Sequence, residues 1–110
     1  MFFRWKDNIM DRLEIIHLRG HSHREKKDPI VAFRQLSVPR RINNLKEISL
    51  FQDHALENDL KIIIRWQGCT EHTGKSPLGL QLAAAFSEFG QIRHTAWEPV
   101  MGYLTQKAKS

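Results

Sequence analysis

Two segments of the chain, 60–66 and 91–97, carry basic and aromatic side chains at alternate positions. Successive side chains of a β-strand point to opposite faces, so Arg65, Arg93 and Trp97 share a face if helices cover the other one. Two guanidinium groups beside an indole can clamp a carboxylate, a phosphate or a flat anionic ring. The same residues also suit a dimer interface in which Trp97 is the anchor and the arginines pair with glutamates across it.

The histidines raise the question of a metal site, above all His17 with the nearby His21 and His23. Antiparallel pairing of their strands could also bring His17 close to His94. Imidazole clusters can bind zinc, copper or iron, but no spacing here matches a strong ligand motif. We therefore expect no metal and no cofactor, with solvated loop histidines and a half-buried, hydrogen-bonded His94. The sequence assigns no catalytic residue, and its predicted ligand-binding residues are His17, Arg65, His94 and Trp97.

Two further features concern the second half of the chain. The segment from Cys69 to Ser76 approximates a phosphate-binding loop, but Cys69 stands where glycine would let backbone N–H groups surround a phosphate. Gly74 to Pro77 instead predicts a loop and a helix cap. Glycine costs a helix interior up to ~1 kcal/mol relative to alanine, so Gly79 predicts a close approach of the sheet or of a ligand.

Composition limits the class of protein. The chain has 110 residues, a net charge of +5 and 41% hydrophobic residues, which is typical of one compact domain. The single Cys69 cannot form an internal disulfide and no signal-peptide pattern opens the chain, so a reducing, cytoplasmic setting is expected. No apolar run approaches the ~20 residues that a membrane span needs.

The elements that must position these residues follow from periodicity and caps. Asp28-Pro29 and Ser76-Pro77 are helix starts, because the cap side chain accepts orphan N–H groups and proline has none to lose. Pro39 and Gly90 are the corresponding stops. Apolar, β-branched runs predict strands over 13–19, 45–51, 60–66 and 91–97.

This order predicts an α+β, ferredoxin-like β-α-β-β-α-β plait. Right-handed crossovers give an antiparallel sheet of order 4-1-3-2 with both helices on one face. The plait occupies residues 13–99, between an apolar N-terminal arm, 1–12, and a C-terminal tail, 100–110. Ile15 and Ile63 carry apolar groups to the face without helices, so we expect the arm or a second copy of the chain to cover it.

The topology, the strands that are apolar on both faces and the ending Phe89-Gly90-Gln91-Ile92-Arg93-His94-Thr95-Ala96-Trp97 resemble the small dimeric α+β barrel proteins, including the antibiotic-biosynthesis-monooxygenase-like group. The resemblance covers roughly residues 13 to 97 and is architectural. It implies a homodimer with a cleft between helices and sheet or between the two sheets. It allows cofactor-independent oxygenase-like activity and transfers no catalytic residue.

The sequence therefore favours a homodimer that binds a small molecule. One alternative is a non-catalytic interaction or regulatory module. A second alternative is nonspecific nucleic-acid binding, which the positive charge suggests. The aromatic test argues against it, because RNA-recognition plaits stack bases on aromatic residues of the two central strands. Here 13–19 has no aromatic residue, and Trp66 lies with the expected core.

Overall fold

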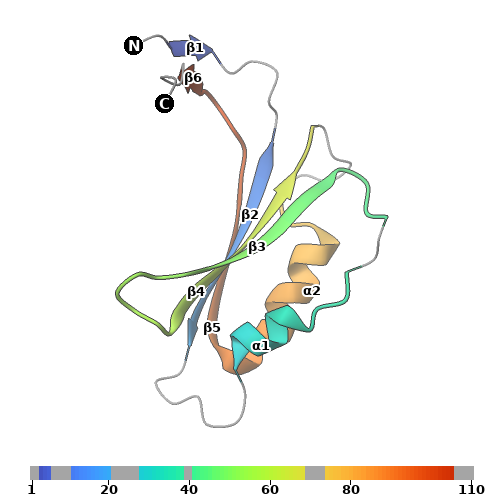
Figure 1. Ribbon diagram of the computed structural model, residues 1–110. Coiled ribbons are helices and arrows are strands. Elements are labelled where there is room, and N and C mark those ends of the chain that lie inside the picture. Colours follow the sequence, from blue (N-terminus) through green and yellow to red (C-terminus); the bar gives the residue numbers. More distant parts are fainter. Residues whose placement is uncertain (1–2, 6–10, 21–27, 39–40, 69–73, 106–110) are drawn as a thin grey trace.

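The computed structural model describes residues 3–5, 11–20, 28–38, 41–68 and 74–105, without the side chains of 3–5 and 103–105. Its elements follow one another along the chain as shown in Figure 1. They are β1 (Phe3–Trp5), β2 (Arg12–Gly20), α1 (Pro29–Arg34), β3 (Leu45–Gln52), β4 (Asp59–Trp66), α2 (Pro77–Phe86), the 3₁₀ turn η1 (Ser87–Phe89), β5 (Gly90–Trp97) and β6 (Tyr103–Thr105).

The larger sheet has four antiparallel strands. Read from the β3 edge, its order is β3-β4-β2-β5, or 2-3-1-4 when these strands are numbered along the chain. Ile16 of β2 lies opposite Ile62 of β4 and His94 of β5. β3 pairs with β4 beyond an irregularity between Leu45 and Glu47. Because directly opposite residues share a face, this register fixes which side chains each face carries.

The hydrophobic core lies on the face that the helices cover. It consists of alternate side chains of β2 and β4 with the inner side of α2 and η1: Ile16, Leu18, Leu60, Ile62, Ile64, Trp66, Leu82, Phe86 and Phe89. Partly buried side chains of α1, including Ile30 and Phe33, pack against the same cluster. Removing these apolar groups from water is the main force that holds α2 on the sheet.

Both helices begin as their caps predict. Asp28 Oδ1 accepts from the N–H of Ile30 at 2.8 Å, and Ser76 Oγ accepts from the N–H of Gly79 at 2.9 Å. α2 ends at Phe86 and is followed by η1, which ends directly before Gly90. α1 has only six residues and ends well before Pro39, so the short apolar stripe, rather than the proline, sets its length.

The structure corrects the predicted fold class. The six elements of a β-α-β-β-α-β plait do not account for the described chain, which has six strands in two separate sheets. β1 and β6 pair with each other, with Trp5 opposite Tyr103. Figure 1 shows them beyond one end of the larger sheet, so β1 does not cover the helix-free face. Strands of three residues leave too little alternation to recognise in a sequence.

Neither described helix is long and apolar enough to cross a membrane.

Candidate functional site

The helix-free face of the larger sheet is made of the side chains that alternate with the core. On β2 the alternate positions that are not fully buried are Leu13, Ile15, His17 and Arg19. The register places Lys61 of β4 on one side of His17 and Arg93 of β5 on the other. Directly opposite residues of antiparallel strands have Cβ atoms about 5 Å apart. Three basic side chains therefore follow one another across the sheet, and we call Lys61, His17 and Arg93 the basic row.

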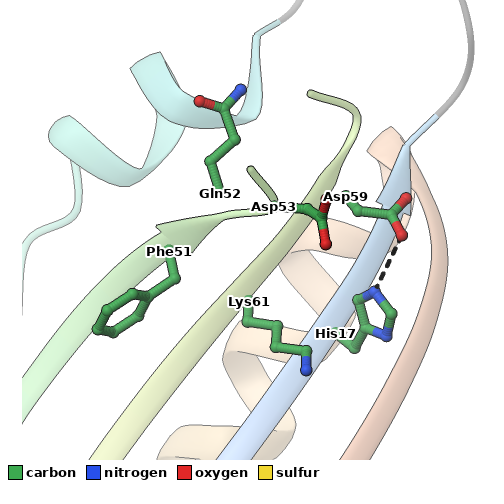
Figure 2. Close-up of a pocket in the computed structure, with 6 residues that line it drawn as sticks. All are labelled: His17, Phe51, Gln52, Asp53, Asp59 and Lys61. Atoms are coloured by element: carbon green, nitrogen blue, oxygen red, sulfur yellow. Dashed lines mark ion pairs between the residues drawn. The ribbon is translucent and has the colours of Figure 1, made fainter. Parts of the chain in front are cut away.

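Two shallow hollows flank His17. The basic hollow has a volume of about 240 Å³ and is lined by His17, Arg19, Gln91, Ile92 and Arg93. The acidic hollow has a volume of about 170 Å³ and is lined by His17, Phe51, Gln52, Asp53, Asp59 and Lys61, as Figure 2 shows. Each hollow is smaller than the roughly 300 Å³ at the lower end of ligand pockets. His17 lines both hollows and so lies between them.

Asp59 forms ion pairs with two of the residues that line the basic hollow, His17 and Arg19. Its Oδ2 lies 3.5 Å from His17 Nε2 and 3.8 Å from Arg19 Nε, and its side chain is 13% exposed. Lys61 and Arg93, by contrast, have no ion-pair partner within the part of the chain that the structure describes. The positive charges of Lys61 and Arg93 on this face favour the binding of an anion.

The four residues predicted as ligand-binding do not form one cluster. Arg65 and Trp97 share the helix-free face, but Leu13 of β2 lies between them, which separates their strands by about 10 Å. Arg65 pairs with Glu47 at 3.1 Å, and Trp97 Nε1 donates to Thr95 Oγ1 at 2.9 Å.

His17 and His94 lie on opposite faces of the sheet. The first pairs in register with Arg93 on the helix-free face, and the second lies opposite Ile16 of the core. The expected approach of the two histidines is therefore wrong. The described residues hold no group of three or more side chains suited to a metal ion. His21, His23 and the segment 69–73 lie outside the described residues.

A buried polar network on the helix-covered face was not predicted. Glu14 of β2 is 1% exposed. Its Oε1 accepts from the N–H of Ser76 at 2.9 Å and lies 2.9 Å from His94 Nε2, while its Oε2 accepts from Trp66 Nε1 at 2.7 Å. An ionised carboxylate only accepts, so His94 donates through Nε2. His94 Nδ1 is buried and has no hydrogen-bond partner within the described chain.

The network fixes the N-terminus of α2 on the sheet. Burial by itself would raise the pKa of Glu14, but hydrogen bonds from Ser76, Trp66 and His94 outweigh it and hold the pKa below its ordinary value of 4.5. A Cβ on Gly79 would overlap Glu14 Oε1 and would come within 2.9 Å of His94 Cε1. The close approach predicted from Gly79 is thus confirmed, with the sheet as the neighbour.

One sequence signal could have revealed the network. Glu14 alternates with Leu13 and Ile15 and therefore shares its face with Ile16 and Leu18, so it is a charged residue at a core position. A carboxylate there needs several donors. The indole of Trp66, which is expected in the same core, is one of them.

Comparison of the chain with protein-family models, with curated proteins and with solved structures gives no match. The resemblance to dimeric α+β barrel proteins stays a prediction.

Proposed function

We propose that the protein binds a small anionic molecule over His17 on the helix-free face. The observation that carries the proposal is the basic row, in which Lys61 and Arg93 flank His17 in direct cross-strand register. Lys61 and Arg93 bring positive charge to this face, and no carboxylate among the described residues forms an ion pair with either of them. A bound carboxylate or phosphate would accept charge-assisted hydrogen bonds from these side chains.

The electrostatic balance of the basic hollow supports this choice of ligand. Arg19, Arg93 and His17 line it, and none of the described residues that line it carries a carboxylate. Asp59 of the neighbouring strand β4 pairs with His17 and Arg19. Among the described residues no carboxylate pairs with Arg93. Arginine presents a planar fork that suits a carboxylate or a phosphate, so Arg93 is the principal anchor that we propose.

We propose further that the site is completed in a homodimer. Both hollows are shallow, and a ligand gains affinity and selectivity when most of its surface is buried. Ile15 and Ile63 lie on the same face and are only partly buried, and Trp97 is 56% exposed. A second copy that packs on this face would bury these groups and close the hollows. Oxygenase-like chemistry rests on the family resemblance alone.

A titration followed by NMR tests the proposed anion site. Benzoate and inorganic phosphate are the probes, and the variants are Arg93→Gln and Arg19→Gln, at two residues that line the basic hollow. Each variant removes one charged donor, so we expect affinity for both probes to fall about tenfold. Arg34→Gln, on the exposed side of α1, is the matched control and should leave affinity unchanged. Equal affinity in the wild type and in Arg93→Gln, or no saturable binding of either anion, would refute the proposal.

A further inference from the structure

The two hollows beside His17 differ in charge, although they share a wall. The basic hollow contains two arginines, whereas the acidic hollow contains Asp53 and Asp59 with a single lysine. A ligand that covers both hollows must therefore present different groups at its two ends.

The acidic hollow contains a hydrogen-bond acceptor that the backbone holds in place, the carboxylate of Asp53. Asp53 Oδ1 accepts from the N–H groups of Ala55 and Leu56, each at 2.8 Å. These bonds fix the carboxylate in the turn after β3, and among the described residues no donor is bonded to Oδ2. The hydrogen bonds from Leu56 and Ala55 lower the pKa of Asp53, so it is ionised at neutral pH. Asp53 thus holds one free carboxylate oxygen at the edge of the hollow.

Asp59 and Phe51 complete the acidic hollow. Figure 2 shows Asp53 and Asp59 at the same end, whereas the ring of Phe51 lies on the far side of Lys61 from His17. Phe51 is 52% exposed and offers an apolar surface to the body of a ligand. A simple anion would use none of these three groups.

We infer that the ligand is a carboxylate or phosphate with an apolar body and with a hydrogen-bond donor, an amine or a hydroxyl, at its far end. Its anionic group contacts Arg93 and Arg19 in the basic hollow. Its body lies over His17 toward Phe51, and its donor reaches the free oxygen of Asp53. This inference rests on the proposed function, because it keeps Arg93 as the anchor of the anionic end.

Three ligands of nearly equal size test the inference: para-ethylbenzoate, para-(hydroxymethyl)benzoate and para-(aminomethyl)benzoate. They differ only in the group at the far end, which is a methyl group without a donor, a neutral hydroxyl donor, or an ammonium donor that also carries a positive charge. We expect the two donor-bearing ligands to bind the wild type about fivefold more tightly than para-ethylbenzoate, because a donor that meets an exposed carboxylate adds a charge-assisted hydrogen bond.

Asp53→Asn is the deciding variant. Asparagine keeps the carbonyl oxygen that accepts from Ala55 and Leu56, so the turn is preserved, but it replaces the free carboxylate oxygen by a donor. We expect the advantage of para-(aminomethyl)benzoate to disappear, while the affinity for para-ethylbenzoate stays the same. Glu47→Gln makes the same chemical change elsewhere on this face and should leave all three affinities unaltered.

The outcomes separate the two proposals. If all three benzoates bind with equal affinity and Arg93→Gln weakens them, the anion site stands and the inference about the far end is wrong. The same holds if the advantage of the donor survives in Asp53→Asn. If none of the three binds, the proposed function fails and the inference fails with it.

Discussion

The two faces of β2 differ in whether their charged side chains have partners. Glu14 is buried on the helix-covered face, and donors from three other parts of the chain surround its carboxylate. His17 lies three positions further on the helix-free face, between Lys61 and Arg93, and neither of these two has an ion-pair partner among the described residues. A buried charge whose hydrogen bonds are complete serves the fold, whereas a surface charge left without a partner is available to a ligand. Substitutions on the two faces should therefore affect different properties.

The largest expected effect is the loss of stability in Glu14→Gln. Both oxygens of Glu14 accept hydrogen bonds from N–H groups, and glutamine replaces one of these oxygens by an NH₂ group that cannot accept them. The free energy of unfolding should therefore fall by about 3 kcal/mol. Urea denaturation measures it. Glu47→Gln breaks the exposed pair with Arg65 and should cost less than ~1 kcal/mol. Equal costs for the two variants would contradict the division between the faces.

Gly79→Ala should have the next largest effect. At an open helix position this change stabilises a protein by up to ~1 kcal/mol, but here the new methyl group would overlap Glu14 Oε1. We expect a loss of about 2 kcal/mol in the free energy of unfolding, because α2 must move away from the sheet. Gln81→Ala, at an exposed position of the same helix, is the control. A stabilised Gly79→Ala would show that α2 does not approach Glu14 closely.

Acid should remove the contribution of Glu14. The pKa of Glu14 is lower in the folded protein than its ordinary value of 4.5, so the carboxylate contributes stability above that pH and loses it as the pH falls through the folded value. The difference in free energy of unfolding between the wild type and Glu14→Gln should therefore be largest at neutral pH and should narrow below pH 4.5. Asp53 also has a lowered pKa, but both proteins contain Asp53, so its effect cancels in the difference between their free energies of unfolding. A difference that grows in acid would contradict the assignment.

The smallest expected effect is a gain, not a loss, in the free energy of unfolding. Arg93→Gln relieves repulsion from Arg19 across the basic hollow, so it should raise the free energy of unfolding by about 0.5 kcal/mol while it weakens anion binding. Lys61→Gln loses the attraction between Lys61 and Asp53 and should give no gain. Arg65→Gln removes a paired charge from the same face and should give no gain. Urea denaturation of the three variants at low salt checks this contrast. A loss of stability in Arg93→Gln would mean that its charge is already compensated.

The sequence predicted the elements of the larger sheet well because their signals are local. Runs such as Ile62 to Ile64 identify strands, and the pairs Asp28-Pro29 and Ser76-Pro77 identify helix starts. The strands β1 and β6 were missed because three residues carry no period and their pairing joins opposite ends of the chain.

The candidate site was harder to predict because it depends on register. Alternation along one strand correctly placed Arg65, Arg93 and Trp97 on one face, but it does not say which residue lies opposite which. Only the pairing of β2 with both neighbours reveals that Lys61 and Arg93 flank His17. The same pairing separates His17 from His94, because the side chain of His94 points to the core face and that of His17 points to the helix-free face.

Backbone amide shifts of the wild-type protein, recorded while benzoate is added, test the proposed anion site most directly. We expect saturable changes that centre on His17, Lys61 and Arg93 of the helix-free face, with little change around Glu14 and the N-terminus of α2. Changes that centre on α2, or that never saturate anywhere in the described chain, would contradict the proposed anion site.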